Sequence, residues 1–371
     1  MIIERYIHRE ILQRLFWIGI LLLLIFTTNK FVDYLGDAAA GKIPANFVFK
    51  LLWLRMVAMQ TEVLPMLIFL AVILAFSRLN ADNELAVLAA AGVGKRQQLK
   101  IVMRFTIVFS LLVAFVAFFA APWAKINISK LKIQAWQEAN ITGLTEGKFK
   151  ELRKGNSVVY IENLSDDKKI MKKVFLQIQE NDKTSVVKSD SAHFDVDQES
   201  GNRFIVFENG RRYLGQPGMQ DYQITEYEKY AALVQLNDDK GDISSAEATP
   251  TYQLLGSKNP KHKAEFQWRI SSIIICFLLA ILGVLLNQYP FGQKPFTLLL
   301  FGILIYFIYN NLLGVSKTLL EREHVPFFLG LWWVHALLIL AILVIYNYQT
   351  IIQRQRRNTG VQILLAENED H

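Results

Sequence analysis

Six apolar segments, each long enough to cross a lipid bilayer as a helix, constrain the fold of this chain more than any other feature. A hydrocarbon core of roughly 30 Å takes about 20 helical residues to cross. Apolar residues make up 52% of the 371 residues, which is far from the profile of an ordinary soluble domain. The predicted spans run approximately Leu15–Val32, Val57–Phe76, Ile101–Ala121, Ile270–Leu286, Phe296–Val315 and Phe327–Tyr348.

The first span has to be distinguished from a cleaved signal peptide, because three arginines precede it and an alanine run follows. Apolar regions of signal peptides extend only about 7–15 residues. This segment is longer, and charged residues such as Asp33 and Asp37 separate it from the alanines. We therefore expect a permanent membrane anchor.

The distribution of Lys and Arg predicts the orientation, because short cytoplasmic loops retain these residues. With the N-terminus inside, the cytoplasmic pieces hold the excess: Arg5, Arg9, Arg14, Arg78, Lys95, Arg96, Lys100, Arg104, Lys294, Arg354, Arg356 and Arg357. Both termini and the tail 349–371 are then cytoplasmic, and the long insert lies outside. These loop charges account for the net charge of +7 without any nucleic-acid partner.

The insert from about 125 to 268 separates spans one to three (1–124) from spans four to six (269–348). It contains short alternating, β-branched and aromatic stretches between Gly, Asn and Asp turn signals. Several antiparallel strands with no helical crossover favour a sandwich or jellyroll. The expected strands are Asn156–Leu164, Lys172–Glu180, Thr184–Asp197, Arg203–Gly215 and Asp221–Val234, with "NDKT" and "QESGNR" as turns. The predicted class is thus an α+β membrane protein.

The sequence contains no complete nucleotide-binding or metal-binding motif. The stretch "AAAGVGKRQQ" resembles a phosphate-binding loop, but Ala89 replaces the first glycine and Arg96 the hydroxyl residue that holds magnesium. Cys276 is the sole cysteine and lies in an apolar segment, and the six histidines are scattered. His335 is therefore expected in a helix interface, and we expect no metal, cofactor or catalytic residue in this chain.

Three local motifs carry a family resemblance: "MIIERYIHREIL" at the start, "GKIPANFV" at 41–48, and "NELAVLAAAGVGK" between spans two and three. In this order, around three spans, a β domain and three more spans, the chain resembles the LptF/LptG permease family. These are the membrane subunits of the lipopolysaccharide-exporting ABC transporter of the bacterial inner membrane. The motifs favour the LptF type, and the resemblance covers essentially the whole chain.

The resemblance implies the function and the partners. Two permease subunits pair, here with an LptG-type chain, and engage a dimer of a separate LptB-type ATPase that uses the ATP. The periplasmic β-jellyroll passes lipopolysaccharide to a bridge of LptC/LptA-type jellyrolls. The chain itself would be no enzyme.

The segment 80–92 is helix-compatible, with Asn80 as a candidate N-cap and Gly92 as a terminator. Glu84 and Leu88 share one face with Leu85 beside them. By residue pattern alone, a solvated loop helix and a partner contact are equally good interpretations. The resemblance favours a coupling helix that contacts the ATPase through Glu84, Leu85 and Leu88.

Lys30 and Lys317 end spans one and five on the external side, at the expected depth of lipid headgroups. Lysines at such a depth commonly extend to water. The resemblance instead implies that both contact the phosphates of lipopolysaccharide. Asp33 lies one turn from Lys30, where some relatives have a base, so the resemblance implies that phosphate binding relies more on the partner subunit here.

Three other classes of function remain as alternatives. A membrane-embedded enzyme would have only Glu62, Asn310, Asn311 and His335 within its spans, with no nucleophile paired to a base. An anchor or receptor for a periplasmic partner would use the β domain without needing a cytoplasmic contact helix. An ion-coupled transporter usually has inverted repeats and broken spans, which the sequence does not display.

Overall fold

The fold is that of a computed structural model, which describes residues 2–40, 43–142, 146–152, 157–165, 170–180, 183–196, 202–216, 223–235, 246–287 and 295–348. The chain divides into two compact units. The helical unit comprises Met1–Asn29, Leu54–Lys125 and Thr249–His371, and the second unit comprises Lys30–Trp53 and Ile126–Ala248. The expected tail 349–371, parts of two strand-connecting turns and the first residues of the "GKIPANFV" motif lie outside the described residues.

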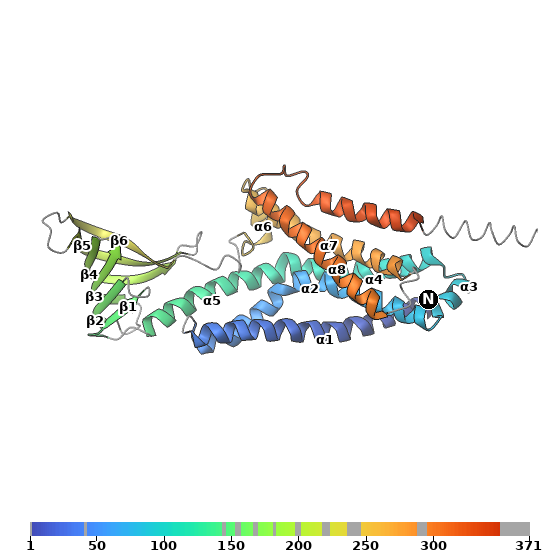
Figure 1. The fold of residues 1–371 in the computed structure, drawn as a ribbon, viewed down its shortest axis with the longest axis horizontal. Helices are drawn as coiled ribbons and strands as arrows, with labels where there is room; N and C mark the ends of the chain where they lie inside the picture. Colours follow the sequence, from blue (N-terminus) through green and yellow to red (C-terminus); the bar gives the residue numbers. More distant parts are fainter. Residues whose placement is uncertain are drawn as a thin grey trace, which may run out of the picture. The chain divides into compact units, whose positions relative to one another are not determined.

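The first three predicted spans lie within the long helices that precede the sheet, and these helices extend beyond the predicted bounds (Figure 1). They are α1 (Ile2–Ala39), α2 (Ala45–Ala81), the short α3 (Glu84–Ala90), α4 (Lys95–Phe115), the π-helix η1 (Val116–Ala120) and α5 (Ala121–Thr142). After the sheet follow α6 (Thr251–Leu254), α7 (Pro260–Leu286), α8 (Pro295–Glu321) and a last helix, Trp332–Tyr348.

By length and composition, 5 of the described helices can cross a membrane: Ile2–Ala39, Ala45–Ala81, Lys95–Ala135, Pro260–Leu286 and Pro295–Glu321. The last helix is apolar but shorter than these five. It begins at Trp332, five residues after the predicted start, because turns occupy the segment from 322 to 331. The chain is therefore a helical membrane protein with a β domain, and the count of six spans stays a prediction.

Two apolar clusters hold the helical unit together. In one, α2, α7, α8 and the last helix pack around residues such as Phe69, Leu279 and Leu313. In the other, α1, α2 and α4 meet around Ile11 and Phe76. Because the side chains that α7 buries contribute to both clusters, this helix lies at the centre of the unit.

The β domain is an antiparallel sheet whose described strands are six, in the sequential order β1-β2-β3-β4-β5-β6. Their bounds are β1 Phe149–Leu152, β2 Ser157–Leu164, β3 Ile170–Glu180, β4 Lys183–Val196, β5 Arg203–Gly215 and β6 Gln223–Gln235. Alternate residues such as Val159, Ile161 and Phe207 are buried on one face, as period-two patterning requires. The antiparallel strands are confirmed, and β1 is an additional strand. The jellyroll and the expected domain bounds stay predictions.

Candidate functional site

Arg78 brings three helices together at one end of the helical unit. Its guanidinium lies 3.0 Å from Glu10 on α1 and 3.0 Å from Asp82 just beyond α2. It also lies 3.3 Å from Glu84 at the start of α3, which in turn accepts a hydrogen bond from the Tyr6 hydroxyl. Glu10 is buried and has Arg14 as its second cation, 2.8 Å away. Glu84 is thus already paired within its own chain.

Residues with positive φ lie on both sides of the short helix α3. Asn83, at φ 59°, precedes it, and Gly92, at φ +88°, follows it, where a glycine is favoured. The expected N-cap at Asn80 is wrong. Asn80 lies in the last turn of α2, because buried Leu79 continues the apolar face of that helix, and its amide donates to the Asn287 carbonyl at 3.3 Å.

The packing of α3 divides its apolar residues into two sets. Leu85 and Leu88 are partly buried against the α1–α2–α4 cluster. Val87 is 68% exposed, and Ala86 and Ala90 are exposed with it. The face left open to a partner therefore differs from the pair of leucines that the family resemblance implied. The role of Glu84, Leu85 and Leu88 in coupling stays a prediction.

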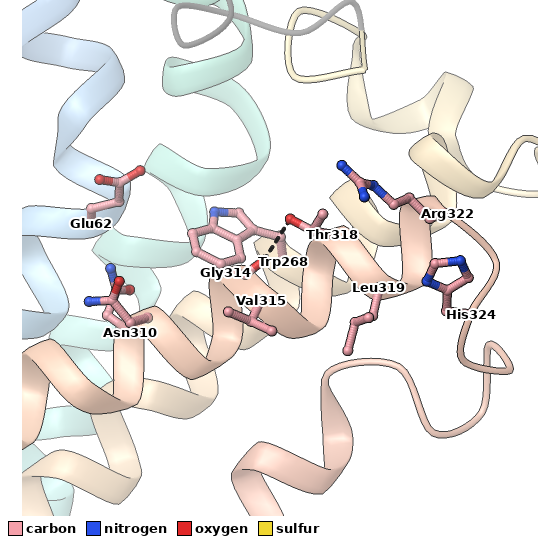
Figure 2. A pocket seen from close by; sticks show the side chains of 10 residues that line it. Glu62, Trp268, Asn310, Gly314, Val315, Thr318, Leu319, Arg322 and His324 are labelled. Atoms are coloured by element: carbon pink, nitrogen blue, oxygen red, sulfur yellow. Dashed lines mark hydrogen bonds between the residues drawn. The ribbon is translucent and has the colours of Figure 1, made fainter.

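A cavity of about 560 Å³ lies along α8. Figure 2 shows Glu62 of α2 and Asn310 of α8 at one end, Trp268 of α7 at the middle, and Arg322 and His324 at the other end. The Tyr306 hydroxyl donates to the Glu62 carbonyl at 2.7 Å and so joins α8 to α2 beside the cavity. Polar groups and charged groups of both signs thus line a hollow in a predominantly apolar bundle, which is the kind of place where a membrane protein holds a charged ligand.

Lys317 lies next to this cavity but faces an internal acid. Its ammonium is 2.8 Å from the Glu265 carboxylate and 5.2 Å from the ring centre of Trp268. Glu265 is 2% exposed and also accepts from Arg269 at 3.0 Å. The sequence reading missed Glu265 and Arg269, although their spacing of one helical turn at the start of an apolar helix was visible.

Lys30 belongs to the second unit and makes an ion pair with Asp33, 2.8 Å away. Both side chains are substantially exposed, the acid more than the base. The acid one turn from Lys30 therefore contacts the lysine directly. The lysine keeps enough exposure to meet a ligand as well.

A second hollow, of about 580 Å³, lies on the sheet between β4, β5 and β6. It contains the Arg211–Glu226 pair, 2.8 Å apart, and Tyr227, which donates to the Lys188 carbonyl at 3.2 Å. Burial raises the pKa of Tyr227 to about 12, so the hydroxyl stays protonated as a donor at neutral pH. The charged groups that line this hollow carry both signs and are already paired in part. The hollow therefore has no clear preference for an anion.

The comparison with known proteins decides the family. Residues 5–348 match the sequence profile of the lipopolysaccharide export system permeases LptF/LptG. The chain belongs to the LptF/LptG permease family. It is 28% identical over 360 residues to the lipopolysaccharide export system permease protein LptF of Escherichia coli strain K12, covering 96% of this chain and 98% of that protein. The LptF protein of Shigella flexneri gives the same figures.

Family membership confirms the resemblance drawn from the three sequence motifs. It also identifies the chain as a lipopolysaccharide export permease by family, with the apolar helices and separate sheet that such a membrane protein needs. Within this LptF/LptG permease, the structure brings Lys317 to the edge of the α8 cavity, and it places Glu84 in the Arg78 cluster.

Proposed function

We propose that this chain is the LptF-type permease subunit of an ABC transporter that extracts lipopolysaccharide from the outer leaflet of the bacterial inner membrane. The observation that carries the proposal is the polar cavity along α8, with Glu62 at one end and Arg322 at the other, in a chain that matches the permease family over residues 5–348. Arg322 lines the cavity and Lys317 lies at its edge, so two cations can meet the phosphates of a lipid headgroup.

The partners follow from this role. An LptG-type subunit pairs with the chain in the membrane, and an LptB-type ATPase dimer binds on the cytoplasmic side and supplies the energy of ATP hydrolysis. The exposed face of α3, with Val87 at its centre, is the surface that we assign to the ATPase. LptC/LptA-type jellyroll proteins receive the lipid from the β domain in the periplasm. Both termini are cytoplasmic in this arrangement.

Lys30 and Lys317 contribute to lipid capture through charge. A charge-assisted hydrogen bond in a partly desolvated headgroup zone contributes on the order of 1.5–3 kcal/mol. Lys317 is only 13% exposed and Lys30 is 33% exposed, so the former is the better shielded from water. We therefore assign the stronger phosphate contact to Lys317.

Transport is tested with the complex purified from membranes and reconstituted in liposomes that contain lipopolysaccharide. The expected result is transfer of the lipid to a soluble jellyroll acceptor that requires ATP, with the ATPase co-purifying. Deletion of 83–92 should abolish both. An anchor or receptor without transport activity would bind the acceptor equally well with or without ATP and without α3, which would refute the proposal.

Orientation is tested separately by proteolysis of membrane vesicles. The β domain should resist protease in intact inverted vesicles and be cleaved once these are opened. Cleavage of the sheet in intact inverted vesicles would contradict the proposed topology.

A further inference from the structure

Glu265 is a buried acid that binds two cations of different accessibility. Its Oε1 accepts from the Arg269 Nε at 3.0 Å, and its Oε2 accepts from the Lys317 Nζ at 2.8 Å. Arg269 is 2% exposed, whereas the Lys317 side chain is 13% exposed. One cation is therefore enclosed with the acid, and the other lies between the acid and the outside.

Arg269 is held in place by contacts that do not involve Lys317. Its guanidinium donates to the Thr251 hydroxyl at 2.7 Å and to the Thr249 carbonyl at 2.9 Å. The Thr251 hydroxyl in turn donates to the Phe118 carbonyl in η1, at 2.6 Å. That carbonyl is available because Pro122, four residues later, has no N–H to donate to it.

This support means that the acid stays compensated when Lys317 moves. A carboxylate as enclosed as Glu265 cannot be solvated by water, and an uncompensated buried charge is strongly unfavourable. Arg269 remains beside it in a fixed geometry. Of the two cations, Lys317 can therefore move away from Glu265 at the smaller cost in free energy. Its stem is flexible, and its ammonium already lies over Trp268 at the cavity wall.

We propose that a lipid phosphate displaces Glu265 as the ion-pair partner of Lys317. This competition between the carboxylate and the phosphate limits how tightly the permease retains its lipid. This inference rests on the proposed function, in which Lys317 contacts lipid phosphate. In the lipid-free state Glu265 positions the ammonium at the edge of the cavity. Binding exchanges one charge-assisted hydrogen bond for another, and release reverses the exchange.

The direction of the effect distinguishes this role from simple structural support. An acid that competes with phosphate weakens lipid retention, so its removal strengthens it. The worth of one charge-assisted hydrogen bond corresponds to about tenfold in affinity. An acid that merely stabilises the fold would lower lipid retention when removed, whatever residue occupied position 317.

The test uses the assembled transporter in lipid nanodiscs, with lipid A that carries or lacks its phosphates as the probe. Glu265→Gln should retain phosphorylated lipid A about tenfold more tightly and release it more slowly on addition of ATP. Retention of the dephosphorylated lipid should not change. In a Lys317→Gln background, Glu265→Gln should have no effect on retention.

Folding is controlled with two further variants. Glu265→Asp keeps the charge near Arg269 but withdraws the carboxylate from Lys317, so it should shift retention in the same direction with less loss of stability. His335→Gln disturbs a buried hydrogen bond of the same bundle, 2.6 Å from Tyr309, and reports what general destabilisation does to retention.

Two outcomes would overturn the inference. One is weaker lipid retention by both Glu265 variants. The other is that Glu265→Gln changes lipid retention equally whether position 317 holds Lys or Gln. If Lys317→Gln alone leaves retention of phosphorylated lipid unchanged, the lysine is no lipid contact and both this inference and that part of the proposed function fail. If lipid retention depends on Lys317 as proposed but does not change in the Glu265 variants, only this inference fails.

Discussion

Arg78 and Glu84 meet across the turn between α2 and α3, with the guanidinium Nη2 3.3 Å from the carboxylate Oε1. The same arginine contacts the buried Glu10 of α1. The orientation of α3 is therefore tied to two long helices by one side chain. A movement of α3 caused by a bound ATPase would reach both helices through it.

Replacing Arg78 with Gln should loosen α3. The free energy of unfolding should fall by only about 1 kcal/mol, because the arginine is partly exposed and Glu10 keeps Arg14. Retention of the ATPase should fall severalfold, since a pre-oriented contact helix binds at lower entropic cost. Co-purification and thermal unfolding measure the two effects. Arg104→Gln, which breaks the more exposed pair with Glu4, is the matched control and should leave the ATPase bound.

Val87→Asp should release the ATPase while the permease stays folded, because this exposed side chain lies on the open face of α3. Leu88→Ala should instead lower stability, because Leu88 packs against the core cluster of its own unit. Pull-down of the ATPase and unfolding curves of the two variants separate the roles. Tyr252→Ser, an exposed change on α6, should affect neither. If Val87→Asp binds the ATPase normally, the open face is not the contact surface.

Gly302→Leu should destabilise the bundle by about 1–3 kcal/mol through overpacking. A Cβ at this position would lie 2.5 Å from the Cδ1 of Ile73, so α8 and α2 approach closely here. Gly36→Leu in α1 has no neighbouring atom within 4 Å and serves as the comparison. Thermal unfolding in detergent measures both. Equal melting temperatures of the Gly302→Leu and Gly36→Leu variants would contradict the close approach of α8 and α2.

Asp33→Asn should increase lipid capture through Lys30. The acid lies 2.8 Å from the ammonium, and an exposed pair of this kind contributes at most about 1 kcal/mol, which corresponds to a gain of up to about fivefold. Photocrosslinking of lipopolysaccharide near position 30 measures capture. The gain should disappear in the double variant Lys30→Gln/Asp33→Asn. A gain that persists there would show that Asp33 acts independently of Lys30.

Features set by local periodicity were predictable from the sequence. The predicted bounds of β5, Arg203–Gly215, agree with the structure, because alternating apolar residues and a terminal glycine mark that strand. The four residues of β1 are too few to display such a pattern, and the strand was missed. Asn80 and Asn83 are chemically equivalent as candidate caps, and only the packing of Leu79 decides between them.

The site was less predictable, because its contacts join distant segments. Lys317 and Glu265 are 52 residues apart and meet only once α7 and α8 have packed. Helical spacing placed Glu84 and Leu88 on one face of α3, with Leu85 beside them, but could not tell whether that face contacts the protein's own core or a partner. The pairing of Glu84 with Arg78 depends on the left-handed turn at Asn83, a conformation that Asn favours but that the nearby Asn80 and Asp82 could adopt as readily.

The π-helix η1 sets the rotational phase of the residues that follow it. The Ala121 N–H donates to the Val116 carbonyl, five positions earlier, so this turn contains one residue more than an α-helical turn would. A residue in an α-helix turns the chain by about 100°. A single-residue deletion within 116–120 that restored α-helical bonding would remove the extra residue and leave the later side chains in nearly their present phase, with Ala121 and Ala124 buried and Trp123 exposed. A substitution that forced η1 into α-helical bonding at its present length would instead rotate every later side chain by about 100°, and exposed Trp123 would turn toward the core. This helix therefore tolerates the loss of one residue in η1 better than the loss of its π-helical bonding.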